Sequence, residues 1–123
     1  MLSDARLAAP FAAYPRVDVL GVPVSAITMA QAVQAVSGWI ARRTPQYVCV
    51  TGVHGVMESG RDESLRATHE RAGLVTPDGM PLVWLARHAG YRHVERVYGP
   101  DLLLAICVAS THEGWRHFFY GGA

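Results

Sequence analysis

Short apolar runs that end at turn residues alternate along this chain with segments of helical periodicity. Gln46–Thr51 is a nearly continuous apolar run, Leu74–Thr76 is a second that stops at a Pro-Asp-Gly turn, and Arg116–Tyr120 is a third that precedes two glycines. We expect all three to be strands, the first of them covered on both faces. This alternation favours a Rossmann-like α/β layer fold with a parallel sheet, and because the chain ends after the third strand we expect that fold to be truncated.

The segments between these runs carry helix signals. Thr28 and Gln31 have the spacing of a capping box, and the apolar residues after them recur at helical spacing as far as Arg42-Arg43. The other predicted elements are a hairpin of Val17–Leu20 and Val22–Ile27, helices from His54 to Met57, Asp62–Ala72, Gly79–His88 and from Gly99 to about His112, and a brief extended piece at Val94–Tyr98. Residues 1–16 are predicted to be a flexible leader to a domain at 17–123.

Composition narrows the class of protein. Eleven basic and ten acidic residues leave a formal charge of +1, which gives no sign of nucleic acid binding. Cys49 and Cys107 lie in apolar runs and are predicted to be buried thiols of a reducing compartment. The N-terminus lacks the pattern of a signal peptide, and apolar runs such as Leu102–Ala109 are much shorter than the ~20 residues of a membrane helix. A cytoplasmic location follows, and the scattered histidines predict no metal site.

Three predicted strand ends carry the residues that could perform chemistry. In a parallel sheet Thr51, Asp78 and the pair Gly121-Gly122 would meet at one edge, where ligands of α/β proteins bind. Asp78 could act as a general base toward a hydroxyl, or could simply cap the following helix. Thr51 could offer its hydroxyl to a phosphate or sugar, or could be an ordinary β-branched strand residue. The two glycines could cradle phosphate, although this signal alone is weak.

Arg96 and Asp101 are the remaining charged candidates. Arg96 could neutralise a diphosphate, or could form a surface ion pair with Glu95 or another carboxylate. Asp101 follows Gly99-Pro100 and is better explained as a residue of a helix start than as a catalyst.

Four stretches in this order resemble the WecG/TagA/CpsF family of bacterial glycosyltransferases. The stretches are Tyr47-Val48-Cys49-Val50-Thr51, Thr76-Pro77-Asp78-Gly79-Met80-Pro81-Leu82-Val83-Trp84, Glu95-Arg96-Val97-Tyr98-Gly99-Pro100-Asp101-Leu102 and Phe118-Phe119-Tyr120-Gly121-Gly122. The resemblance covers roughly residues 18–123, and the ordered set is far more specific than any one stretch.

The resemblance implies inverting transfer of a sugar, N-acetylmannosamine in the best-known members, from a UDP-sugar to a polyprenyl-diphosphate-linked saccharide. Such enzymes build teichoic acid linkage units, enterobacterial common antigen or exopolysaccharide at the cytoplasmic face of the membrane, without a metal or other cofactor. Carried over, Asp78 would deprotonate the acceptor hydroxyl, Thr51 would line the same pocket and Arg96 would face the diphosphate. The other matching positions expected to bind substrate are Gly79, Met80, Tyr98, Gly99, Asp101, Gly121 and Gly122.

This sequence departs from the family pattern in two places. Many members continue the Thr-ended strand as Thr-x-Asn, whereas Gly52, Val53 and His54 follow here. Members also continue beyond the glycine pair with further α/β units and a segment that helps membrane docking, so we expect this chain to correspond to the N-terminal portion of such an enzyme. Two alternatives stay open: a non-catalytic nucleotide-sugar-binding or scaffold fragment, and an unrelated α/β phosphate-binding module.

Overall fold

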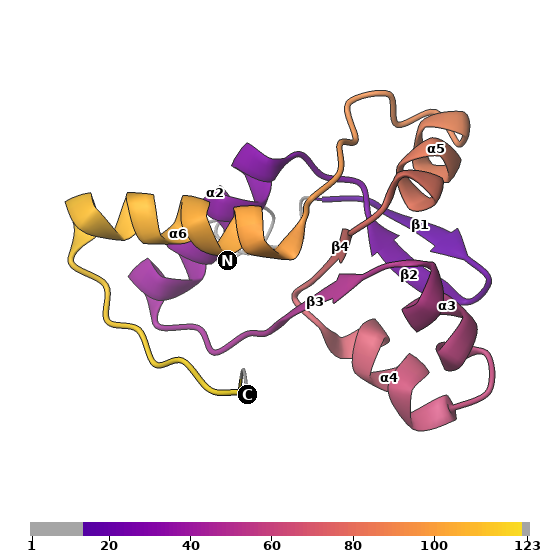
Figure 1. The fold of residues 1–123 in the computed structure, drawn as a ribbon, viewed down its shortest axis with the longest axis horizontal. Coiled ribbons are helices and arrows are strands. Elements are labelled where there is room, and N and C mark those ends of the chain that lie inside the picture. The colour runs from indigo at the N-terminus through magenta and orange to yellow at the C-terminus, as the bar shows by residue number, and fades with distance from the viewer. Residues whose placement is uncertain (1–13, 122–123) are drawn as a thin grey trace, which may run out of the picture.

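Strands and helices alternate along residues 14–121, the part of the chain that the computed structural model describes (Figure 1). In chain order the elements are β1 (Arg16–Val19), β2 (Val22–Ser25), α2 (Met29–Arg42), β3 (Val48–Thr51), α3 (Val53–Ser59), α4 (Glu63–Arg71), β4 (Leu74–Pro77), α5 (Met80–His88) and α6 (Gly99–Glu113). The mixed α/β, Rossmann-like fold is therefore confirmed. Of the predicted leader, residues 1–13 lie outside the described part, and Arg16 is the first residue of β1.

The strands are arranged around β4, which is buried at every position. β3 runs parallel to it on one side, in a register that places Thr51 opposite Pro77. On the other side lies β2, which forms an antiparallel hairpin with β1. The Ser25 hydroxyl accepts a hydrogen bond of 2.9 Å from the Val75 N–H, and both groups are buried. This side-chain bond joins the hairpin to the parallel pair.

Neighbouring residues of β4 enter two different apolar clusters because successive side chains of a strand point to opposite faces. Val75 packs with Leu82 and Val83 of α5 in one cluster. Leu74 packs on the other face with Trp39 of α2 and with the start of α6. Helices therefore cover both faces of the strand that precedes the Pro-Asp-Gly turn.

The predicted capping box at the start of α2 is present. The Gln31 N–H donates to the Thr28 hydroxyl at 3.1 Å, and the Thr28 N–H donates to the Gln31 side chain at 3.0 Å. A contact that the sequence did not predict adds to it, because the Glu95 carboxylate accepts a 2.7 Å hydrogen bond from the Met29 N–H. A carboxylate at this position also suits the positive end of the helix dipole.

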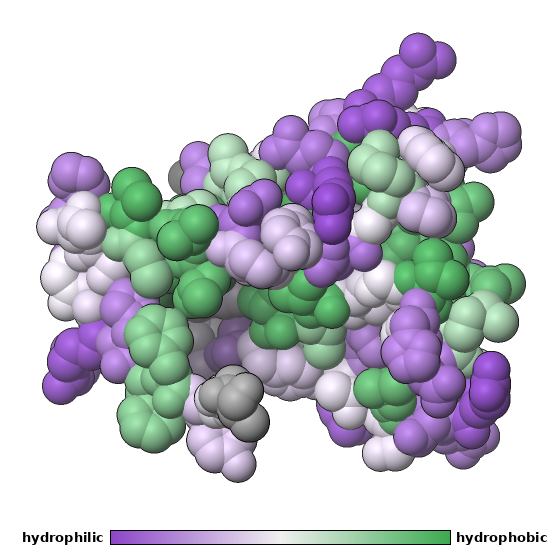
Figure 2. Space-filling view, in the orientation of Figure 1, coloured by the Kyte–Doolittle hydropathy of each residue, from purple (hydrophilic) through white to green (hydrophobic). Residues whose placement is uncertain are grey.

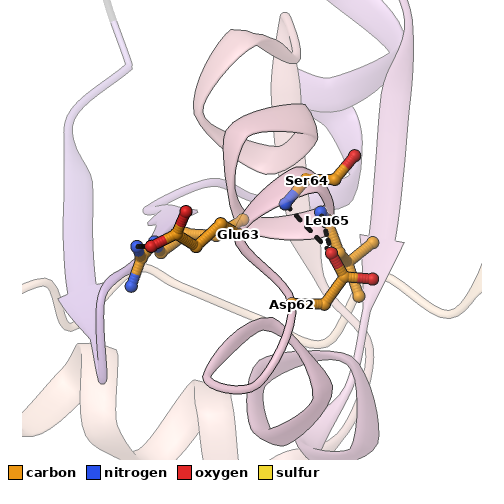
Figure 3. Close-up of polar contacts among 5 residues, drawn as sticks. Asp62, Glu63, Ser64 and Leu65 are labelled. Carbon is orange, nitrogen blue, oxygen red and sulfur yellow. Dashed lines mark hydrogen bonds and ion pairs between the residues drawn. The ribbon is translucent and has the colours of Figure 1, made fainter.

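The start of α4 is fixed in the same way. Figure 3 shows the Asp62 carboxylate accepting hydrogen bonds from the N–H groups of Ser64 at 3.0 Å and Leu65 at 3.2 Å. Asp62 is therefore the N-cap of this helix, whose predicted range of 62–72 agrees closely with the observed one.

The prediction of a third strand at Arg116–Tyr120 is wrong, since residues 115–121 form no strand in the described structure. The side chains of Phe118 and Tyr120 are 90% and 96% exposed, and the segment has no pleated surface to pack on. Aromatic residues favour strands chiefly because they pack well on such surfaces. The expectation that the first strand is covered on both faces is also wrong, because Val50 in β3 is 42% exposed.

Apolar residues also lie on the outer side of α6, where Figure 2 shows hydrophobic surface. Leu103, Leu104 and Val108 are exposed on this helix. No helix within the described residues is long and apolar enough to cross a bilayer.

Arg16 connects the first strand to the end of α4. Its guanidinium donates hydrogen bonds to the backbone carbonyls of His69, Ala72 and Gly73, at 3.4 Å for His69 and 3.2 Å for Gly73. Burial lowers the pKa of this guanidinium, and the nearby Cys49 thiol opposes the shift. The last carbonyls of a helix need partners, and a cation is favourable at this end of the helix dipole.

Replacing Arg16 with alanine should lower the free energy of unfolding by about 1–3 kcal/mol, because partly buried carbonyls would lose their donor. Urea denaturation of the native protein and of Arg16→Ala measures the difference in the free energy of unfolding. Arg61→Ala is the matched control, since Arg61 makes only an exposed ion pair with Glu58 and such pairs contribute little. Equal effects of the two substitutions would contradict a structural role for Arg16.

Candidate functional site

Asp78 follows β4 directly and continues its pairing with β3. Its N–H donates to the Thr51 carbonyl at 2.9 Å, and its side chain is 26% exposed. The N-cap of α5 is Gly79, whose φ of +135° strongly favours glycine. The alternative that Asp78 caps this helix is therefore wrong, and its carboxylate is available for another task.

Arg96 provides the partner of that carboxylate. Its Nε atom lies 3.4 Å from Oδ1 of Asp78, and its guanidinium carbon lies 4.5 Å from the centre of the Tyr98 ring. The segment is held in place by the Val97 N–H, which donates to the Pro77 carbonyl at 2.8 Å. The alternative that Arg96 forms an ion pair with a carboxylate is therefore confirmed. The partner is Asp78 and not Glu95, because the Glu95 carboxylate binds the start of α2.

The beginnings of two helices flank the Asp78–Arg96 pair. α5 begins at Met80, one residue beyond Gly79, and α6 begins at Gly99, directly after Tyr98. Each helix has a proline as its second residue, Pro81 in α5 and Pro100 in α6. Asp101 lies exposed in the first turn of α6. Because the first N–H groups of a helix have no partner within it, each of these helix starts favours an anion. Gly79, Met80, Tyr98, Gly99 and Asp101, all predicted to bind substrate, belong to these starts.

The two glycines at the end of the chain are not part of this arrangement. Gly121 ends the segment that follows α6, and Figure 1 shows that segment in yellow below α6 and the connection from α2 to β3, well away from α5. The predicted meeting of a third strand end with Thr51 and Asp78 is thus wrong, because there is no third strand to bring it there. Gly122 lies outside the described residues.

Thr51 pairs with Pro77, the residue before Asp78, so its side chain lies on the opposite face of the sheet from that of Asp78. It is only 3% exposed. Its hydroxyl lies 2.9 Å from Nε2 of His69, whose Nδ1 lies 3.0 Å from the Leu65 carbonyl and 3.1 Å from the Ser59 hydroxyl. A carbonyl oxygen can only accept, so this geometry assigns a hydrogen to Nδ1, and in that tautomer Nε2 accepts from Thr51. The hydroxyl predicted to line the substrate pocket is engaged in a buried network.

His69 was not among the residues predicted from the sequence to lie at the site. The available signal was its spacing of four residues from Leu65, which places both on one face of α4. That spacing predicts a buried histidine but does not show which strand the helix covers.

A pocket of about 460 Å³ adjoins this network along β3. It is lined by Cys49, Val50, Thr51, Gly52, His54, Gly55, Leu65 and His69. Cys49 and Cys107, predicted to be buried, are free and only partly buried. Burial raises the pKa of the Cys49 thiol, an effect that Arg16 opposes, so this thiol is a poor candidate for a nucleophile.

Gly52 brings the loop after β3 unusually close to the candidate base. A Cβ atom at this position would lie 2.8 Å from the backbone carbonyl oxygen of Asp78. The glycine therefore allows the ends of β3 and β4 to approach each other.

These features define an α/β protein with a partly exposed carboxylate–guanidinium ion pair beside the carboxyl end of β4, one of its parallel strands. The family model of the glycosyl transferase WecG/TagA/CpsF family matches residues 17–123, and the chain belongs to this family. Its class of function is therefore glycosyl transfer, as the resemblance implied. A search of curated proteins found no match to the chain.

Replacing Thr51 with valine should lower the free energy of unfolding by about 1–3 kcal/mol, because Nε2 of the buried His69 would lose its partner. Thr51→Ser keeps the hydroxyl and should cost less. Thermal unfolding of both variants measures the difference. A serine variant no more stable than the valine variant would show that the hydroxyl contributes nothing.

Replacing Gly52 with alanine should cost about 1–3 kcal/mol of stability, because the new methyl group meets the backbone of Asp78 rather than a flexible side chain. Gly99→Ala is the matched control, since a Cβ there would lie at an ordinary 3.5 Å from Val50. Both are compared by urea denaturation. An alanine tolerated equally well at both positions would contradict the close approach.

Proposed function

We propose that this protein takes part in inverting transfer of a sugar from a UDP-sugar to a lipid-linked saccharide at the cytoplasmic face of the membrane. The observation that carries the proposal is the position of Asp78. Its carboxylate leaves the buried strand β4 beside Arg96 and is not used to cap α5. The donor sugar, N-acetylmannosamine or a related hexose, and the polyprenyl diphosphate acceptor follow from the family resemblance.

In this mechanism Asp78 accepts the proton of the acceptor hydroxyl as its oxygen bonds to the anomeric carbon of the donor sugar. The bond from that carbon to the β-phosphate oxygen breaks on the opposite face, and its electron pair leaves with UDP. Arg96 and the starts of α5 and α6 would stabilise the negative charge of the leaving diphosphate. Inversion requires only this one base, because no covalent glycosyl intermediate forms.

Thr51 has a different role in this proposal from the one that the resemblance gave it. Because its hydroxyl lies in the buried network with His69, we assign it to holding the end of β3 in register with Asp78 rather than to contacting the sugar.

Replacing Asp78 with asparagine should reduce kcat by about 10²–10⁴-fold, because the general base is lost. Donor affinity should not be weakened. Release of UDP in the presence of a prenyl-diphosphate-linked monosaccharide measures the rate.

The control for this experiment is Asp18→Asn, which changes an exposed carboxylate on β1 in the same chemical way and should leave turnover unchanged. Full activity of the Asp78 variant would overturn the assignment of the base. Saturable UDP-sugar binding by the native protein with no transfer would favour the alternative of a non-catalytic binding fragment.

A further inference from the structure

The pair formed by Asp78 and Arg96 has the geometry of an ion pair that can be exchanged. Its Nε to Oδ1 distance of 3.4 Å exceeds the 2.7–2.9 Å that is typical of a strong charge-assisted hydrogen bond. The Arg96 side chain is 47% exposed. Ion pairs with this much exposure contribute little, whereas a diphosphate offers a guanidinium several charged oxygens in a geometry that suits its planar fork.

Two anionic groups would compete for this one cation when a nucleotide diphosphate binds at the helix starts. Asp78 and the diphosphate both carry negative charge, so bringing them together around Arg96 would add repulsion between them. In the ion pair Oδ1 of Asp78 is also occupied by the guanidinium and is not available to an acceptor hydroxyl. Exchange of partners gives the guanidinium to the diphosphate and leaves both oxygens of Asp78 for the acceptor.

Tyr98 allows such an exchange without releasing the arginine from the site. Its ring lies under the guanidinium at 4.5 Å, and a cation–π contact does not depend on which anion the guanidinium binds at its edge. Tyr98 precedes α6 directly, so it holds Arg96 beside the helix start where an anion is favoured.

We propose that Arg96 exchanges partners on donor binding. Its guanidinium releases the Asp78 carboxylate and binds the donor diphosphate, and it remains on the Tyr98 ring throughout. This inference rests on the proposed function. Its consequence is an order of events: both oxygens of the carboxylate become available to the acceptor hydroxyl only once the donor is in place. By linkage, the contact with Asp78 opposes diphosphate binding, because the contact must be broken first.

Calorimetric titration with UDP tests the exchange in four proteins: native, Asp78→Asn, Arg96→Ala and the double variant. Asp78→Asn should bind UDP about two- to fivefold more tightly than the native protein, the gain expected from releasing an exposed ion pair. In the Arg96→Ala background the same change should give a smaller gain. If Arg96 instead bridges both anions, Asp78→Asn will weaken UDP binding or leave it unchanged, and the proposal falls.

Uridine is the control ligand, because it lacks phosphate and its affinity should not respond to Asp78→Asn. Tyr98→Phe keeps the ring and should bind UDP as the native protein does, whereas Tyr98→Leu should bind it more weakly. Equal binding by these two variants would remove the ring from the proposal.

A measurement on the native chain covers the case in which a variant fails to fold. The Nε–H resonance of Arg96, assigned by its loss in Arg96→Lys, should shift on addition of UDP but not of uridine, and no shift with UDP would overturn the exchange. The proposed function and the proposed exchange of partners are overturned by different results. Absence of saturable UDP binding by the native protein would overturn both, while UDP binding with transfer but no gain in Asp78→Asn would overturn the exchange alone.

Discussion

Burial of β4 on both faces and along both edges is the constraint on which the rest of the structure depends. Backbone N–H and C=O groups that are removed from water need partners, and each missing partner costs about 1–3 kcal/mol. β3 provides them along one edge, the Ser25 hydroxyl binds the Val75 N–H on the other, and the Val97 N–H binds the carbonyl of Pro77 at the end. The hairpin, the helices between β3 and β4, and the segment before α6 are thereby all fixed relative to one strand.

The candidate site follows from this arrangement. Thr51 ends β3, Asp78 directly follows the neighbouring parallel strand β4, and the two look equivalent in the sequence. Because Thr51 pairs with Pro77 and successive side chains of a strand alternate, the side chains of Thr51 and Asp78 leave the sheet on opposite faces. His69 hydrogen-bonds the hydroxyl of Thr51 inside the protein, whereas the carboxylate of Asp78 meets Arg96, which lies over the Tyr98 ring, where solvent can enter. The end of β3 thus stabilises the fold, whereas the residue that follows β4 is left accessible to a ligand.

Signals that act over a few residues could be predicted from the sequence. The capping box of Thr28 and Gln31, the start of α4 at Asp62 and the strand that leads to Asp78 are such cases, because their partners lie nearby in the chain. The side on which Thr51 points depends on the register of β3 against β4, and its bond to His69 depends on which strand α4 covers. The segment Arg116–Tyr120 has the composition of a strand without forming one, because aromatic residues favour a packed sheet surface and this segment has none to pack on.

The peptide bond between Pro77 and Asp78 marks an abrupt change in local stability. On one side lies the most deeply buried strand of the described structure, and on the other a carboxylate held only by a weak, partly exposed contact. Regions with few buried contacts rearrange at little cost, whereas core strands open only when the protein unfolds. Ligand entry can therefore be accommodated by side chains while the backbone that carries the carboxylate stays still. The reorganisation cost of binding then falls on two side chains and not on the fold.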